Sequence, residues 1–333
     1  MRLYPLRFYE IYKPKIWGGR ALETVLGKSL PAGETVGESW ELSDHFDDLS
    51  VVRNGALEGM TLRDVWRKAA ADVLGRDIAS KKPKEFPLLV KFIDAQEDLS
   101  LQVHPDEKYA REHDEKGEFG KNEAWYVITA KSGAELILGV REGTTKDQLK
   151  RLLDAGRIEE ALSRTRVKAG DLVHVSAGTL HAIGAGILLC EIEESSDATY
   201  RVWDWGRTGE DGKPRPLHVN HALNVMDFAR GPVKPEKPAD SGDGDVKRQI
   251  LDRCESFAIE RIVAEKRFTE TAPDGRFYIF VCVGGSGSIV AEGQRFPYVL
   301  GDTILVPAVL EPVAVEPAEP CTLLKTYVPR VES

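Results

Sequence analysis

The sequence has few of the features that mark a membrane protein or a nucleic-acid-binding protein. Acidic residues outnumber basic ones by 54 to 45 over 333 residues, which gives a net charge of −9. Binding along a nucleic acid needs a basic face to neutralise phosphates, and no basic block of that length is present. The longest mostly apolar run, 304–315, contains two prolines and a glutamate and is too short to cross a bilayer. We therefore expect neither a nucleic acid nor a membrane as a partner.

Cysteine and methionine are also scarce, with four and three residues. The cysteines stand at 190, 254, 282 and 321, without a C-x-x-C pair, so we interpret them as isolated buried thiols in a reducing compartment. The first eight residues lack the apolar core of a signal peptide. Apolar residues make up 42% of the chain, which is enough for a folded core. These features predict a soluble, cytoplasmic, globular protein.

Short strand-like segments, broken by glycine, proline and aspartate, fill most of the chain. We expect strands at 87–94, 99–104, 123–129, 134–140, 171–176, 187–194, 277–283, 286–291, 303–307 and 322–328. Helical spacing of apolar residues occurs at 61–75, at 145–163, where Gly156 could split the helix, and from Pro105 to about His113. Many short strands with frequent turns are typical of an all-β sandwich or barrel, so the helices are interpreted as insertions.

The segment 231–247 has almost no large apolar residue and is rich in proline, glycine and aspartate. This composition predicts a linker or an exposed loop. We therefore divide the chain into an N-terminal catalytic unit, 1–230, and a C-terminal unit, 248–333. Strands from the N-terminus are expected to complete the second unit.

An internal echo supports two related β units. Gly170-Asp171 and Gly301-Asp302 each precede a strand of alternating pattern. His181 stands eleven residues after the first glycine, whereas Pro312 has that place after the second. If a histidine at this position binds a metal, only the first unit can do so, and the second is expected to be metal-free.

Four polar side chains form a candidate metal site in the first unit. Gln102 and His104 are two residues apart on one predicted strand and share a face; Glu123 opens another strand, and His181 follows a third. Two imidazoles, a carboxylate and an amide oxygen suit a borderline divalent cation, zinc first, with manganese and cobalt as alternatives. The order of these residues follows the two metal-binding motifs of the cupin barrel.

Longer motifs resemble those of type I phosphomannose isomerases, in their short bacterial form. The matching segments are 13–19, 37–43, 99–106, 120–123, 176–183 and 195–205. Two positions depart from the family pattern: Ser176 replaces the more usual proline, and Asn122 occupies the middle of a Lys-x-Glu element. The resemblance implies a mainly β fold of two cupin (jelly-roll) β-barrel units with helical insertions. It also implies zinc held by Gln102, His104, Glu123 and His181.

The activity implied by the resemblance is interconversion of mannose 6-phosphate and fructose 6-phosphate, with Arg201 as an essential arginine. Moving a carbonyl between C1 and C2 requires a base for a carbon-bound proton and stabilisation of an enediolate. Glu191 is the leading candidate base, because its place in Glu-x5-Asp-x3-Arg matches a family active-site glutamate. Glu193 lies on the same strand face and remains an alternative. A salt-bridged or solvated carboxylate without a role in proton transfer is the simpler interpretation of Glu191.

A sugar phosphate bound by an acidic protein needs fixed cationic donors. Arg201 offers a planar fork, and Lys121 shares a strand face with Glu123. Lys91 lies in an apolar run, where an ammonium requires an anion unless the strand is an edge facing water. Ser100 would add a hydroxyl donor, and Trp17 would form a wall of the sugar site or pack in the core.

Other residues and other functions remain open. Arg207, Lys213 and Arg215 are interpreted mainly as solvated charges of one loop, with one of them expected to reach the mouth of the cleft. His174 is interpreted as an inward-facing partner of the metal site. An iron-dependent cupin oxygenase and a catalytically silent sugar-phosphate-binding protein are the alternative functions. The oligomeric state is not predicted.

Overall fold

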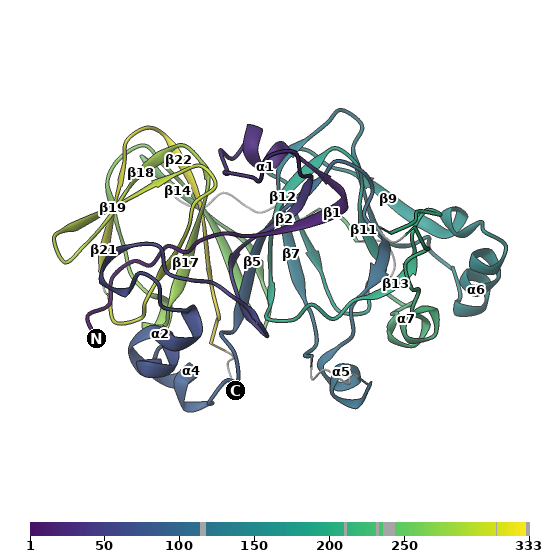
Figure 1. The fold of residues 1–333 in the computed structure, drawn as a ribbon, viewed down its shortest axis with the longest axis horizontal. Helices are drawn as coiled ribbons and strands as arrows, with labels where there is room; N and C mark the ends of the chain where they lie inside the picture. Colours follow the sequence, from purple (N-terminus) through teal and green to yellow (C-terminus); the bar gives the residue numbers. More distant parts are fainter. Residues whose placement is uncertain (114–117, 210–211, 231–232, 236–243, 311, 331–333) are drawn as a thin grey trace.

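The computed structural model describes residues 1–113, 118–209, 212–230, 233–235, 244–310 and 312–330. The fold is mainly β, as predicted, and most of its strands form four antiparallel sheets (Figure 1). The first sheet has the order β1-β2-β5-β12-β7-β10, formed by Ile11–Gly19, Val36–Leu42, Leu88–Ala95, Ile187–Glu194, Glu123–Ala130 and Leu172–Val175. The second has the order β13-β6-β11-β8-β9, formed by Tyr200–Trp203, Leu101–Val103, His181–Ile183, Glu135–Val140 and Leu162–Arg166. A small ribbon pairs β3 (Asp44–His45) with β4 (Asp48–Leu49).

The other two sheets come from the C-terminal part of the chain. The third sheet has the order β14-β15-β22-β17-β20, formed by Val246–Arg253, Ala258–Ala264, Cys321–Tyr327, Tyr278–Gly284 and Thr303–Val306. The fourth has the order β16-β21-β18-β19, formed by Phe268–Glu270, Val313–Pro317, Ser286–Ala291 and Gln294–Val299. The third sheet repeats the sequence-order pattern of β2-β5-β12-β7-β10, and β10 and β20 are the strands that follow the two Gly-Asp pairs. This correspondence agrees with the internal echo.

The helices are short. They are α1 (Ala21–Thr24), α2 (Leu62–Lys68), α3 (Ala70–Leu74), α4 (Arg76–Ser80), α5 (Glu107–His113), α6 (Lys146–Asp154) and α7 (Val219–Val225), with 3-10 turns at Gly55–Leu57, Ile158–Ala161 and Pro273–Gly275. Thr61 caps α2 by accepting a hydrogen bond from the Asp64 backbone at 3.0 Å, so the predicted start is confirmed. The expected helix at 145–163 is split at Gly156, as the sequence allowed: α6 ends at Asp154, and a 3-10 turn follows at Ile158–Ala161. Gly156, with φ of 67°, turns the chain, and Leu162 pairs with Val140 at the sheet edge.

Side-chain alternation in β5, β7 and β12 separates two interiors. One face of these strands contributes to a core shared with the third sheet and with helices α2–α4; its members include Val90, Phe92, Ala124, Tyr126, Cys190, Ile192, Ile279 and Leu324. The opposite face looks into the space between the first and second sheets, where apolar residues such as Ile93, Trp125, Leu138 and Leu189 pack. Lys91, Glu123, Glu191 and Glu193 have the parity of this second face. The polar site is therefore inside the N-terminal pair of sheets.

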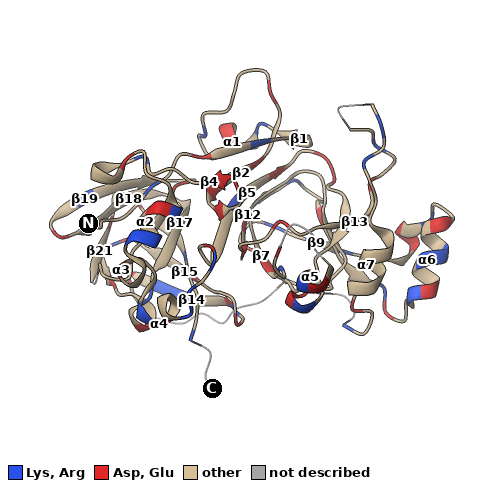
Figure 2. Cartoon of the chain, turned by 60° about the horizontal axis from the view of Figure 1, so that its bottom comes forward, with Lys and Arg blue, Asp and Glu red and all other residues tan. Residues whose placement is uncertain are grey.

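The N-terminal segment also contacts the C-terminal sheets. Leu6 forms two backbone hydrogen bonds with Leu305 of β20, at 2.8 and 2.9 Å. Residues 231–232 and 236–243 of the predicted linker lie outside the described residues, and the proposed division of the chain stays a prediction. All four cysteines are free, and all but Cys254 are buried. Figure 2 shows charges of both signs spread over helices α2, α5 and α6. Among the described residues, no helix has the length and apolar character needed to span a membrane.

Candidate active site

Three of the four predicted metal ligands meet in the interior of the N-terminal sheets. His104 follows β6, Glu123 opens β7 and His181 opens β11, and one potential ligand atom from each lies within 4.8 Å of the others. Glu123 Oε2 is 3.4 Å from His104 Nε2, and Glu123 Oε1 is 3.4 Å from His181 Nε2. All three side chains are essentially inaccessible to solvent. The carboxylate thus lies between two imidazole nitrogens.

The backbone fixes which ring nitrogens face the carboxylate. His104 Nδ1 is 2.6 Å from the carbonyl of Ala198, and His181 Nδ1 is 2.8 Å from the carbonyl of Thr179. A carbonyl only accepts, so each Nδ1 carries a proton and each Nε2 is the ring nitrogen that faces Glu123. The two Nε2 atoms and both Glu123 oxygens are buried without a hydrogen-bond partner, although Lys121 Nζ forms an ion pair with Glu123 Oε2 at 3.1 Å. Such a group of buried nitrogen and oxygen atoms is expected where a cation binds.

Electrostatics keeps this set in the form that a metal requires. Burial lowers the pKa of His181 to about 3, despite the nearby Glu123, so its imidazole is neutral. Burial alone would raise the pKa of Glu123, but Lys121 and the two histidines hold it well below its usual range. A buried carboxylate beside the neutral imidazole of His181 and the Nε2 atom of His104 fits a divalent metal ion.

The fourth predicted ligand, Gln102, lies beside this group. Its backbone in β6 pairs with His181 on one side and with Arg201 of β13 on the other. Its side chain lines a cleft of about 250 Å³ that adjoins the three buried residues. The lining residues are Lys15, Trp17, Glu38, Lys91, Ile93, Leu99, Ser100, Gln102, Lys121, Ile183, Glu191, Asp197, Thr199, Arg201 and Arg215. All seven predicted catalytic, substrate-binding and ligand residues outside the buried trio line this one cleft.

The two cleft lysines are paired with a carboxylate of the protein itself. Glu193 lies 2.7 Å from Lys91 Nζ and 2.6 Å from Lys121 Nζ, and it has no exposed surface. Burial would lower the pKa of Lys91, but Glu193 and Asp197 raise it above its ordinary value. The edge-strand interpretation of Lys91 is excluded, because β5 lies between β2 and β12. The anion that Lys91 requires is therefore already present.

Glu191 lines the cleft and stands two residues before Glu193, on the same face of β12. Its Oε2 accepts a hydrogen bond from Trp125 Nε1 at 2.9 Å, and its Oε1 is 3.6 Å from Lys91 Nζ. Trp17 both lines the cleft and packs in the apolar core, so the two interpretations offered from sequence describe one side chain. The carboxylate of Glu191 is thus oriented by an indole and a lysine while it faces the cleft.

Arginines gather around Ser100 at one end of the cleft. The Ser100 hydroxyl accepts hydrogen bonds from Arg201 Nε at 3.2 Å and from Arg215 Nη2 at 2.8 Å. Arg215 also pairs with Asp204, as does Arg207. Burial, together with the charge of Arg215, lowers the pKa of Arg201. Arg215 is the loop charge that reaches the cleft, as expected for one of the three, and Ser100 and Asp204 hold it there.

Several residues that line the cleft were not predicted from the sequence to belong to the site. Lys15 and Glu38 form an ion pair at 2.9 Å on β1 and β2, two strands that sequence patterning did not identify. Asp197 stands in the Glu-x5-Asp-x3-Arg motif, which was the available signal. The interpretation of His174 is also wrong. Its parity on β10 turns it toward the third sheet, where Nδ1 lies 2.6 Å from Asp252 of β14.

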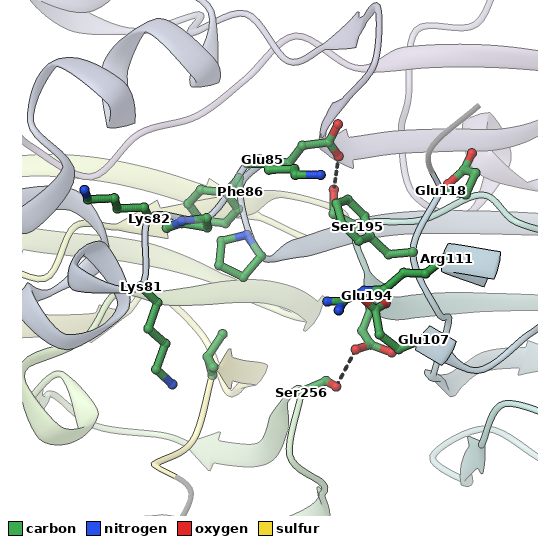
Figure 3. A pocket seen from close by; sticks show the side chains of 15 residues that line it. Lys81, Lys82, Glu85, Phe86, Glu107, Arg111, Glu118, Glu194, Ser195 and Ser256 are labelled. Atoms are coloured by element: carbon green, nitrogen blue, oxygen red, sulfur yellow. Dashed lines mark hydrogen bonds and ion pairs between the residues drawn. The ribbon is translucent and has the colours of Figure 1, made fainter. Parts of the chain in front are cut away.

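A larger groove, of about 970 Å³, lies outside this cleft (Figure 3). Its walls include Lys81, Lys82, Glu107, Arg111, Glu194 and Ser256. None of the residues predicted for metal, substrate or catalysis lines it. The chemistry predicted from the sequence is therefore concentrated in the smaller cleft.

Comparisons with known proteins give a consistent result. The model of the "Phosphomannose isomerase type I, catalytic domain" family matches residues 6–128. Mannose-6-phosphate isomerase ManA of Bacillus subtilis is 35% identical over 311 residues, covering 92% of this chain and 94% of that protein. Mannose-6-phosphate isomerase of Streptococcus mutans is 37% identical over 306 residues, covering 91% of this chain and 92% of that one.

Solved structures agree with this result. The crystal structure of mannose 6-phosphate isomerase from Bacillus subtilis has a TM-score of 0.88 and 34% identity, covering 97% of this chain and 99% of that one. A zinc-bound mannose 6-phosphate isomerase shares the fold, with a TM-score of 0.76 at 18% identity, covering 98% of this chain and all of that one. The resemblance seen in the motifs is confirmed, and the chain belongs to the type I phosphomannose isomerase family.

Proposed function

We propose that the protein is a metal-dependent mannose-6-phosphate isomerase, which interconverts mannose 6-phosphate and fructose 6-phosphate through an enediol. The observation that carries this proposal is the buried Glu123 carboxylate between the Nε2 atoms of His104 and His181. An oxygen of this carboxylate lies within 4.8 Å of one of Glu191, which lines the same cleft as Arg201. The family membership of the chain gives the substrate pair. The site residues supply metal ligands, a binding place for the anion and a candidate base.

The metal we propose is a single zinc ion held by Gln102, His104, Glu123 and His181. The donor set of two nitrogens and two oxygens fits zinc, which is also the metal of one structural neighbour. When bound, such an ion polarises the substrate oxygens and stabilises the negative charge of the enediolate. The protein residues supply the remaining functions of binding, orientation and proton transfer.

Ser100, Arg201 and Arg215 form the proposed anion-binding end of the cleft. Because the Ser100 hydroxyl accepts from two guanidinium groups, its own proton remains available to donate to a substrate oxygen. Asp204 balances Arg215, whereas no ion pair of Arg201 is found among the described residues. We infer that Arg201 binds the phosphate or the enediolate oxygens through its planar fork. Trp17, Lys91 and Lys121 complete the walls.

Glu191 is the proposed base for the carbon-bound proton. It lines the cleft, and the Trp125 indole orients one of its oxygens. Glu193 is the weaker candidate, because it does not line the cleft and lies between two ammonium groups. We infer that Glu193 instead fixes Lys91 and Lys121 in place. A base must lie within hydrogen-bond reach of the proton it removes, and only Glu191 of these two faces that space.

The test is an isomerase assay on the zinc-loaded protein and on two matched variants. Arg201→Ala is expected to lower kcat by about 10²–10³ while metal content and melting temperature stay unchanged. Arg207→Ala is the control, since Arg207 is a neighbouring arginine that pairs with Asp204 but does not line the cleft. Sugar-phosphate binding without any turnover in the unmodified, zinc-loaded protein would favour the silent binding protein. Oxygen consumption that depends on iron and is lost with zinc would favour the oxygenase.

A further inference from the structure

The acceptor that orients His104 belongs to the loop 195–198, between β12 and β13. The Ala198 carbonyl of this loop lies 2.6 Å from His104 Nδ1 and so sets both the ring orientation and the tautomer. The next residue back, Asp197, lines the cleft and lies 3.6 Å from Lys91 Nζ. A shift of this loop would therefore move two groups together: the Ala198 carbonyl that orients His104, and the Asp197 carboxylate in the cleft.

Glu118 holds this loop from the side away from the cleft. Its Oε2 accepts a hydrogen bond from the Asp197 backbone at 3.2 Å and lies 3.1 Å from the Ser196 hydroxyl. The Ser196 oxygen in turn accepts from the Ala198 backbone at 3.2 Å and lies 2.9 Å from the Phe119 carbonyl. Ser196 is completely buried. Two contacts with Glu118 thus fix a turn whose last carbonyl meets His104.

His45 of the β3–β4 ribbon holds Glu118 and a second glutamate. Its Nε2 is 3.2 Å from Glu118 Oε1, and its Nδ1 is 3.6 Å from Glu85 Oε2. Glu85 Oε2 also accepts a hydrogen bond from Ser195 at 3.4 Å, a contact drawn in Figure 3 on the wall of the larger groove. Burial would lower the pKa of His45, but these two carboxylates raise it to about 9, so the ring is a cation. The ribbon is thereby linked to both ends of the Ser195–Ser196 turn.

We propose that His45 and Glu118 are positioning residues for the metal site, which act on His104 through the loop 195–198. Neither residue lines the cleft, so we assign them no direct part in ligation or proton transfer. The inference rests on the proposed metal site. Loss of an outer partner of a metal-bound histidine typically lowers metal affinity by about 10–100-fold. We expect the same effect here, because Glu118, Ser196 and Ala198 connect His45 to His104 through hydrogen bonds.

The experiment measures zinc affinity by competition with a chromophoric chelator, on purified protein stripped of metal and reloaded with zinc. Glu118→Gln, His45→Gln and Ser196→Ala are each expected to weaken zinc binding by about tenfold or more. The matched control is Glu270→Gln, which removes the charge of another buried glutamate, paired with Lys325 at 2.6 Å in the C-terminal sheets. It should leave zinc affinity within about twofold, which separates positioning from general destabilisation.

A double variant tests whether the residues act along one path. Because His45 acts through Glu118, His45→Gln combined with Glu118→Gln should weaken zinc binding little more than the stronger single variant. Zinc affinity that stays within about twofold in folded Glu118→Gln and Ser196→Ala would overturn the inference, as would equal losses in Glu270→Gln. Glu123→Gln separates this failure from failure of the proposed function. If Glu123→Gln also binds zinc normally, the metal site itself is wrong.

Discussion

Replacing Lys91 by methionine tests whether the buried charges of the cleft depend on one another. Lys91 is 2% exposed and lies 2.7 Å from Glu193, with Trp40 packed on the ammonium at 4.4 Å from its ring centre. Methionine keeps much of the volume but leaves Glu193 with one cationic partner, Lys121. Breaking a buried pair typically costs about 3–5 kcal/mol, because the remaining charge is uncompensated. Since Lys121 remains, we expect a loss of about 3 kcal/mol.

The assay is thermal unfolding of the zinc-loaded protein. For a chain of 333 residues, a loss of about 3 kcal/mol corresponds to a fall of roughly 4 °C in Tm. Lys247→Met is the control, since Lys247 is exposed on β14 and the change should stay within about 0.5 kcal/mol. Adding Glu193→Gln to Lys91→Met should recover part of the loss, because it removes the orphaned charge. A Tm of Lys91→Met equal to that of the parent, or a double variant less stable by the full sum, would refute the reasoning.

Three other predictions concern the supports of the site. Because the pKa of His45 is raised to about 9, its contribution to stability is complete below pH 6.5 and is lost as the pH rises through 9. The Tm difference between the parent and His45→Gln should therefore shrink between pH 7 and pH 10, and a constant difference would contradict this assignment. Gly37→Ala would place a Cβ 2.6 Å from the Trp17 ring and 2.7 Å from Lys15, so KM should rise. Gly284→Ala, where the closest contact is 3.5 Å, should leave KM unchanged. Arg215→Ala should raise KM more than it lowers kcat, since Arg215 supports Ser100 and a bound anion; an unchanged KM would remove it from the anion-binding end.

Sequence patterning located β5, β6, β7 and β12, which carry or lead into most of the site residues, but not β11 and β13, which carry His181 and Arg201. The parity of Gln102 and His104 on one strand, and of Glu191 and Glu193 on another, could be read directly because side chains alternate along a strand. Strands β1 and β2 were not predicted because Lys15, Glu38 and Glu41 interrupt their apolar pattern. The ion pairs that balance these charges, Lys15–Glu38 and Lys28–Glu41, join separate segments of the chain. The family motifs supplied the residues that alternation could not connect.

Tertiary pairing explains the errors that remained. The sequence could not show which of the three loop charges reaches the cleft, because Asp204 and Ser100, which hold Arg215, stand on other segments. His174 was assigned to the wrong side of its strand, and the third sheet that receives it comes from beyond the predicted linker. The support of His104 by Glu118 and His45 left no local pattern, because a loop carbonyl transmits it.

The most direct test of the account is the metal content and isomerase activity of the same preparation, before and after chelation. The account predicts one metal ion per chain, loss of mannose 6-phosphate–fructose 6-phosphate interconversion when the metal is removed, and recovery when zinc is restored. His181→Ala should fail to recover under the same conditions, since it removes a ligand nitrogen from the buried site. Full activity in a preparation free of metal, or in His181→Ala, would contradict the central claim.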